Sequence, residues 1–106
     1  MKRKTDAFNL ALGVFLEWGP VQQDDIRDRI SQVVPGLTRT ELKKLLAEFA
    51  SLRSAARRIV EEQVEKHRTE EDGRRQVAEL DSRISVENAS LLYHQARYSA
   101  WRDGFG

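Results

Sequence analysis

The sequence predicts an all-α protein, and three observations support this fold class. Residues that favour helix, chiefly Leu, Ala, Glu, Arg and Gln, dominate the 106 residues. The six glycines and two prolines mostly fall where helices would end. Apolar residues recur at helical spacing along most of the chain. We therefore expect one domain over residues 1–106, a small helical bundle of two short amino-terminal helices and a longer antiparallel helical hairpin.

The first helix is expected over residues 5–18. Thr5 or Asp6 can cap its amino terminus. Gly19-Pro20 ends it, because glycine adopts the left-handed cap conformation and proline lacks the N–H that would continue the helix. Apolar side chains cover most of its circumference, so we expect neighbouring helices to enclose it. One side of this helix carries Phe8, Leu12, Phe15 and Trp18.

The second helix is expected over residues 24–34. Asp24 and Asp25 suit the positive end of the helix dipole, and Pro35-Gly36 ends the helix. Its apolar face consists of Ile26, Ile30, Val33 and Val34.

The third helix is expected over residues 38–71. Thr38 and Glu41 form a capping-box pattern that sets its start, and Gly73 is the expected stop. Arg53 falls within its apolar stripe, so we expect its stem to pack and its head to reach the rim; the alternative is an arginine buried in a subunit interface opposite a carboxylate. The stripe is about 140° wide. It contains Leu42, Leu45, Leu46, Phe49, Leu52, Ala56, Ile59 and Val60.

The fourth helix is expected over residues 74–103, with a weak point at Ser85-x-x-Asn88. Tyr98 and Trp101 share a stripe with other apolar residues, so we expect both to pack in the core against the aromatic residues of the first helix. Tyr93 is expected to be exposed. The stripe consists of Val77, Leu80, Ile84, Leu91, Tyr98 and Trp101.

An alternative to the hairpin is one continuous helix over residues 38–103, because the apolar positions keep a heptad phase across Gly73. The hairpin is favoured for two reasons. Gln63, Lys66, Glu70 and Gly73 would fall in the seam, where they do not suit a coiled-coil interior. A helix of about 98 Å would also need a partner chain to cover its seam.

The composition indicates in which cellular compartment the protein functions and which kinds of protein can be excluded. There is no cysteine, which excludes thiol catalysis, thiolate metal sites and disulfides, and which fits a reducing compartment. The basic residues 2–4 precede an apolar run as in a secretion signal, but Asp6 and Asn9 interrupt the run and no cleavage site follows. No stretch is long enough to span a membrane. We expect a cytoplasmic protein without a membrane segment.

The sequence contains no pattern typical of an enzyme. The only two histidines, His67 and His94, lack the neighbours that metal binding or catalysis requires. There is no glycine-rich phosphate loop and no nucleophile elbow. We therefore expect a non-enzymatic protein with no cofactor, no metal and no small-molecule substrate.

Charge is unevenly distributed although the net charge is only +1. Six basic and two acidic residues lie between 37 and 60, whereas six acidic and two basic residues lie between 61 and 72. The basic residues gather on the face of the third helix opposite its apolar stripe, with Ala and Ser between them. This face is either solvated or binds an anionic partner, and its small residues would let a phosphate backbone or another helix come close. The candidate binding residues are Arg39, Thr40, Lys43, Lys44, Arg57 and Arg58.

The second helix, the turn at Pro35-Gly36 and the start of the third helix resemble a helix-turn-helix unit. The fit is partial, because the turn is one residue too long and contains a proline, and the preceding helix is acidic. We expect a DNA-binding protein that forms a homodimer or higher oligomer through its later helices. The alternative is a helical protein-interaction module, as in an adaptor, an inhibitor or a structural oligomer. Its basic face would then bind an acidic protein surface, for example residues 61–72 of a second copy.

Overall fold

The computed structural model describes residues 4–17 and 23–104, and the elements within these ranges are helices. They are α1 (Lys4–Glu17), α2 (Gln23–Val33), α3 (Arg39–Glu65), α4 (Glu70–Ala78) and α5 (Val86–Arg102). No strand occurs within the described ranges. The predicted all-α class and small helical bundle are therefore confirmed.

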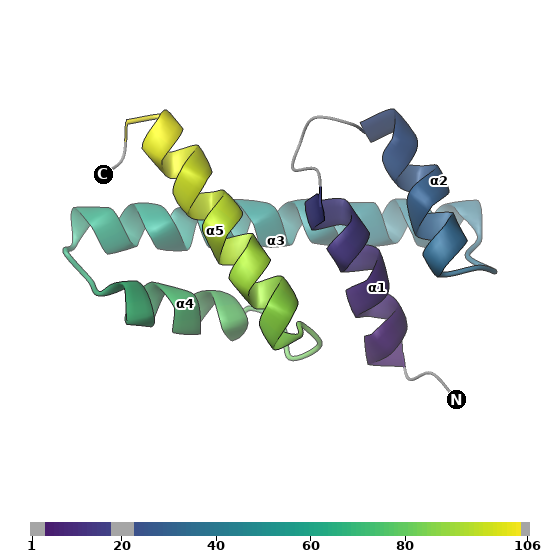
Figure 1. The fold of residues 1–106 in the computed structure, drawn as a ribbon, viewed down its shortest axis with the longest axis horizontal. Helices are drawn as coiled ribbons and strands as arrows, with labels where there is room; N and C mark the ends of the chain where they lie inside the picture. The colour runs from purple at the N-terminus through teal and green to yellow at the C-terminus, as the bar shows by residue number, and fades with distance from the viewer. Residues whose placement is uncertain (1–3, 18–22, 105–106) are drawn as a thin grey trace.

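The long helix α3 packs against α1, α4 and α5, whereas α2 packs mainly on α1 (Figure 1). α1 and α2 pack on each other and lie across the half of α3 that begins at Arg39. α4 runs back beside the other half, and α5 packs on both α3 and α4. The molecule measures 44 × 28 × 18 Å, which makes it a flat bundle about two helices thick.

The predicted bounds of the third and fourth helices are wrong. α3 ends at Glu65 rather than near residue 71, and the chain from 70 to 102 forms two helices instead of one. The continuous helix over residues 38–103 is also excluded, because residues 66–69 and 79–85 are not helical. Part of the expected hairpin is present, since α4 packs antiparallel beside the end of α3 (Figure 1).

A non-glycine residue ends α3, and for this reason the predicted stop at Gly73 is wrong. His67 adopts a left-handed backbone conformation with φ of 53°. Its N–H donates to the carbonyl of Val64 at 3.3 Å, and the Arg68 N–H donates to the carbonyl of Gln63 at 2.9 Å. These two bonds form a Schellman motif, in which glycine is the usual left-handed residue. Thr69 then caps α4 by accepting a hydrogen bond from the Asp72 N–H at 3.1 Å.

The pattern Ser85-x-x-Asn88, predicted as a weak point, is the start of a helix. Ser85 caps α5 by accepting a hydrogen bond from the Asn88 N–H at 3.2 Å. Asn9 of α1 reinforces this end of α5, because its side-chain oxygen accepts from the Ser85 N–H at 2.8 Å and its side-chain nitrogen donates to the Arg83 carbonyl at 2.7 Å. The loop between α4 and α5 is thus tied to α1.

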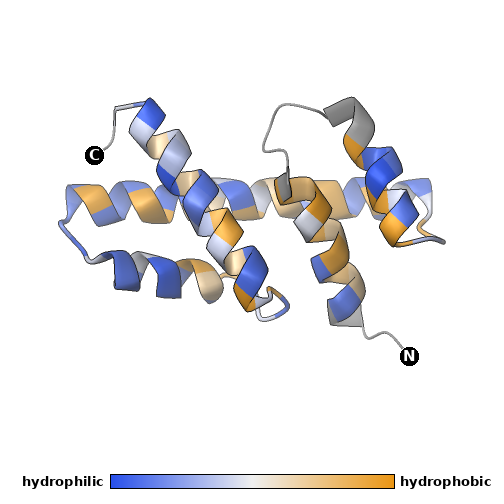
Figure 2. Ribbon diagram, in the orientation of Figure 1, coloured by the Kyte–Doolittle hydropathy of each residue, from blue (hydrophilic) through white to orange (hydrophobic). Residues whose placement is uncertain are grey.

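Three phenylalanines form the centre of the core. The ring of Phe49 in α3 lies 5.4 Å from the ring of Phe8 and 5.4 Å from that of Phe15, both in α1. Figure 2 shows that apolar residues dominate α1 and the part of α3 behind it, whereas α4 is mainly hydrophilic. α1 is not fully enclosed as predicted, because Leu10 keeps 40% of its surface exposed. Trp18 lies outside the described residues.

A buried hydrogen bond joins α3 to α5 beneath α4. The Tyr93 hydroxyl donates to Gln63 Oε1 at 2.8 Å, and both side chains are buried. Gly73 of α4 lies directly over this pair, so that a Cβ atom at residue 73 would overlap Gln63 Oε1 and lie 3.0 Å from Tyr93 Cε1. The expectation that Tyr93 is exposed is therefore wrong, and Gly73 lies within a helix because the packing there leaves no room for a side chain.

Tyr98 and Trp101, which were predicted to pack in the core, lie on the surface. Tyr98 is 61% exposed and Trp101 is 66% exposed. The face of α5 that packs against the core is instead rich in alanine. These small side chains let the backbone of α5 approach α3 more closely than larger side chains would allow. The buried residues of this face are Asn88, Ala89, Leu92, Tyr93, Ala96 and Ala100.

Arg53 is half-buried at the contact between α3 and α1. Its guanidinium lies 4.2 Å from the centre of the Phe15 ring and donates to the Phe15 carbonyl at 3.4 Å. Burial lowers the pKa of Arg53 from its ordinary value. The stem packs as predicted, and the head contacts a carbonyl and an aromatic ring.

Within residues 4–17 and 23–104, each helix is too short or too polar to cross a bilayer.

Candidate nucleic-acid interface

The basic face of α3 is exposed along most of its length. Arg39, Thr40, Lys43 and Lys44 lie on the first two turns, and Arg58 lies five turns further along. The small residues between them are exposed as well, namely Ala47, Ala50, Ser51 and Ser54. Since the helix rises about 1.5 Å per residue, Arg39 and Arg58 lie about 28 Å apart along its axis. The face is therefore a long, narrow strip with its charge concentrated at the amino-terminal end.

A capping box fixes the end of α3 that carries most of this charge. The Thr38 hydroxyl accepts from the Glu41 N–H at 3.1 Å, and the Glu41 carboxylate accepts from the Thr38 N–H at 2.9 Å. This backbone hydrogen bond lowers the pKa of Glu41 below its ordinary value of 4.5. The acid of the first turn is thereby held against the cap, so Arg39 and Lys43 do not pair with it.

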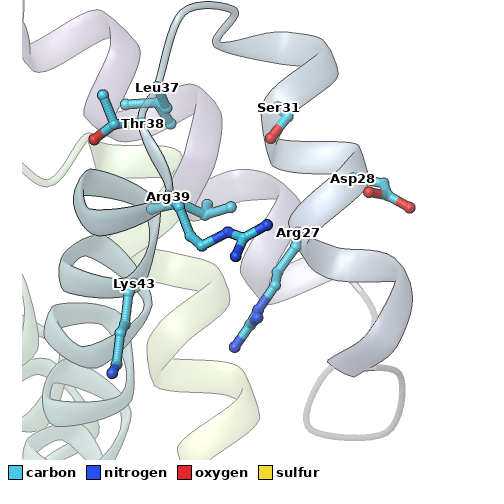
Figure 3. Close-up of a pocket in the computed structure, with 8 residues that line it drawn as sticks. Arg27, Asp28, Ser31, Leu37, Thr38, Arg39 and Lys43 are labelled. Carbon is cyan, nitrogen blue, oxygen red and sulfur yellow. The ribbon is translucent and has the colours of Figure 1, made fainter.

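An open pocket of about 560 Å³ lies between α2 and the start of α3. Figure 3 shows Arg27 of α2 and Arg39 of α3 reaching toward each other across it, with Lys43 one turn further along α3. Asp28 also lines the pocket, but its carboxylate points away from the two arginines (Figure 3). The full lining consists of Arg27, Asp28, Ser31, Leu37, Thr38, Arg39, Leu42 and Lys43.

The cations around this pocket pair with no acidic side chain that the structure describes. No ion pair joins Arg27, Arg39, Lys43 or Lys44 to another residue in the described part of the chain. Cations that line one pocket repel each other, and a bound anion would turn this repulsion into favourable interactions. Arg27 was not among the predicted binding residues, because only the fold brings α2 against this end of α3.

Arg57 differs from the other candidate residues because the chain itself occupies its guanidinium. Its Nε lies 2.7 Å from Glu61 Oε2, and a terminal nitrogen lies 3.0 Å from Asp103 Oδ2. The other terminal nitrogen donates to Ser99 Oγ at 2.8 Å. Arg57 is half-buried and joins α3 to the end of α5, so its role in this structure is to hold the fold.

A shallow hollow of about 340 Å³ lies beside Arg58 on the same strip. It has no deep wall, because its floor is formed by small residues. The hollow is lined by Ala50, Ser51, Ser54, Ala55 and Arg58. The side chain of Arg58 is exposed and forms no ion pair with another described residue. This part of the strip is flat enough for another surface to approach the helix backbone.

The α2–α3 corner has some features of a helix-turn-helix unit. α2 ends at Val33 and α3 begins at Arg39, so five residues separate the helices, whereas the turn of such a unit commonly has three or four. Gly36 adopts φ of 92° within this turn, a conformation that favours glycine. α2 packs mainly on α1. The corner therefore presents the first turns of α3 outward, with the pocket rather than close packing beside α2.

The acidic residues that follow the basic strip pair within the chain. Glu61 pairs with Arg57, and Glu62 pairs with Lys66 at 2.7 Å. In α4, Glu70 lies 3.6 Å from Arg74, and Asp72 lies 3.1 Å from Arg75. These local pairs account for much of the charge in the acidic block.

The described residues contain no group of three or more histidine or acidic side chains that could hold a metal ion. His67 is exposed at the end of α3, and His94 lies 3.4 Å from the guanidinium of Arg74. A scan against protein-family models and searches of curated proteins and of solved structures find no match for this chain.

Proposed function

We propose that this protein binds DNA without catalysis, using the amino-terminal half of α3 and the facing side of α2. The observation that carries the proposal is the convergence of Arg27, Arg39 and Lys43 on one open pocket, where none of the three pairs with an acid among the described residues. Arginine and lysine in this arrangement suit the phosphate oxygens of a nucleic-acid backbone.

The residues have different roles in this proposal. Arg27, Arg39 and Lys43 bind backbone phosphates around the pocket, while Thr40 and Lys44 on the first turns of α3 face the groove. Arg58 is about 28 Å from Arg39 along the helix and contacts only phosphates. A homodimer would present this surface twice, as paired half-sites on a duplex require.

The test is the salt dependence of binding to a labelled duplex of random sequence, measured by fluorescence anisotropy. Four phosphate contacts, from Arg27, Arg39, Lys43 and Arg58, predict a slope of about −3.6 in a plot of log K against log salt, which is a loss of roughly 150-fold between about 50 and 200 mM salt. Arg39→Glu with Lys43→Glu should weaken binding and lower the slope by about two. Arg68→Glu is the matched control, because Arg68 is an exposed cation beyond the far end of α3. Absence of binding at low salt would refute the proposal.

A second candidate function is docking of a helix from an acidic protein onto the same strip. The hollow beside Arg58 favours it, since small residues let another helix come close. Residues 61–72 of a second copy suit this role less well, because four of their acids already pair within the chain. Ser54→Arg separates the two functions. The added cation should strengthen binding to DNA, whereas its bulk should block a docked helix.

A further inference from the structure

α5 carries an unusual amount of exposed apolar surface. Among the described residues, five large apolar side chains are exposed, and four of them lie on this helix. Leu91, Tyr98 and Trp101 are 43%, 61% and 66% exposed and lie along one side of the helix, opposite its buried face. The rings of Tyr98 and Trp101 lie 6.2 Å apart, so they already form a joined aromatic surface. We call Glu87, Leu91, Tyr98, Trp101 and Arg102 the outer stripe of α5.

The outer stripe is not needed to complete the core. The inward face of α5 is filled by Ala89, Leu92, Tyr93, Ala96 and Ala100, and no other helix crosses over its outward side in Figure 1. Exposed apolar patches with a polar rim are typical of surfaces that bind another protein. Tyrosine and tryptophan in particular are enriched at such surfaces.

The order of residues in the stripe is self-complementary. Glu87 and Arg102 lie at opposite ends, and the midpoint between them falls between residues 94 and 95. Leu91 and Tyr98 lie inside them and share the same midpoint. If a second α5 packs antiparallel with its two-fold axis at this point, Glu87 faces Arg102 of the second copy, and Leu91 faces Tyr98 of the second copy. Both kinds of contact then form twice, as an isologous interface requires.

The charges at the two ends are available for such pairing. Glu87 forms no ion pair with another residue in the described ranges, and Arg102 has only a long contact of 3.7 Å to the neighbouring Asp103. Glu87 and Arg102 are 15 residues apart, or about 22 Å along the helix, so both ends of a straight helix pair can form ion pairs together.

We propose that the outer stripe of α5 is the interface of a homodimer in which two copies of α5 pack antiparallel. This proposal does not depend on DNA binding, because none of the stripe residues belongs to the basic strip of α3. Two aromatic side chains that are about two-thirds exposed contribute roughly 250 Å² per copy. This is well below the roughly 800 Å² per partner of a standard interface. The dimer should therefore dissociate in the micromolar range.

The first experiment measures the mass of the full chain by sedimentation equilibrium, without DNA, over a concentration range that spans the micromolar. The mass should rise from one chain towards two. Tyr98→Arg should weaken the dimer at least tenfold, because it places a charge against Leu91 of the second copy. Ala78→Arg is the matched control, since it adds the same charge at an exposed position on α4 outside the stripe. Far-ultraviolet circular dichroism should show that both variants keep their helix content.

The second experiment tests the antiparallel register by reversing charges. Glu87→Arg alone and Arg102→Glu alone each bring like charges together at both ends of the interface, so each should weaken the dimer. The double variant restores opposite charges and should recover most of the lost affinity. A wild-type chain that stays monomeric throughout would overturn the proposal. A dimer that Tyr98→Arg leaves unchanged would also overturn it, because another surface would then join the two copies. Recovery in the double variant supports the register, and failure to recover excludes it.

Discussion

Gly73→Ala should destabilise the protein, although alanine favours a helix more than glycine does. Gly73 lies in the interior of α4, where the substitution would ordinarily stabilise by up to about 1 kcal/mol. Here the added Cβ would overlap Gln63 Oε1 and lie 3.0 Å from Tyr93 Cε1. Gln63 must then move, and its buried hydrogen bond with the Tyr93 hydroxyl is lost.

The magnitude follows from the two groups left without a partner. Each buried polar group that loses its hydrogen bond costs about 1–3 kcal/mol. After the gain in helix propensity, the net loss of unfolding free energy should be about 2 kcal/mol. For a domain of this size, each kcal/mol lowers the melting temperature by about 4–8 °C, so we expect a decrease of about 8–16 °C. Thermal unfolding followed by circular dichroism measures this change.

Gly13→Ala is the matched control, because Gly13 also lies inside a helix. A Cβ there would lie 3.5 Å from Asn88 Oδ1, an ordinary contact, so the variant should gain about 0.5–1 kcal/mol. In a Gly73→Ala/Gln63→Ala double variant the overlap disappears, and the loss should be smaller than the sum of the single losses. A Gly73→Ala protein that melts at or above the wild-type temperature would show that Gln63 does not lie beneath residue 73.

Two further predictions concern the loop before α5. Asn9→Ala should lower the unfolding free energy by about 2 kcal/mol in urea titrations, because the Arg83 carbonyl and the Ser85 N–H lose their partner. Asn9→Asp keeps the acceptor for the Ser85 N–H and should lose less stability. An Asn9→Ala protein as stable as the wild type would contradict the role of Asn9. Hydrogen bonds from Arg83 lower the pKa of Asp81 below 3.8. The folded-state pKa lies below the unfolded one, so this contribution is present above about pH 4 and is lost as the pH falls through the folded-state value. Asp81→Asn should therefore cost about 0.5–1 kcal/mol at pH 7 and less at pH 3, and a pH-independent difference would refute this assignment.

Helix starts could be predicted from the sequence better than helix ends. A cap depends on residues three apart in the chain, so the Thr38 and Glu41 pattern predicted the start of α3 to within one residue. Ser85 carries the same kind of local signal for the start of α5, and the prediction of a weak point there is wrong. The end of α3 depends on His67 in a left-handed conformation, and a histidine at that position carries no local signal for a stop.

The choice of the buried face of α5 could not be made from hydrophobicity alone. Hydrophobicity favours burial of Trp101 and Tyr98 over Ala96 and Ala100. The structure buries the alanines because the close approach of α5 to α3 leaves no room for larger side chains. This distance depends on both helices, so it cannot be predicted from the sequence of α5 alone.

The exposed strip of α3 follows from helical periodicity, and for this reason Arg39, Thr40, Lys43, Lys44 and Arg58 lie where the sequence indicates. Contacts between distant segments do not follow from periodicity. The guanidinium of Arg57 binds Asp103 and Ser99, which lie 42 or more positions away in the chain. The same limit applies to the pocket, where α2 and α3 each supply part of the lining.

The tie between Asn9 and the Arg83–Ser85 turn spans 74 to 76 positions, which has a consequence for synthesis on the ribosome. Translation adds roughly 5–20 residues per second, so α1 is made roughly 4–15 s before its last partners. During the first part of this interval the nascent chain has Phe8 and Phe15 but not yet Phe49, whose ring lies 5.4 Å from both of theirs. Newly made chains should therefore be a better substrate for chaperones that hold apolar segments than the finished protein is.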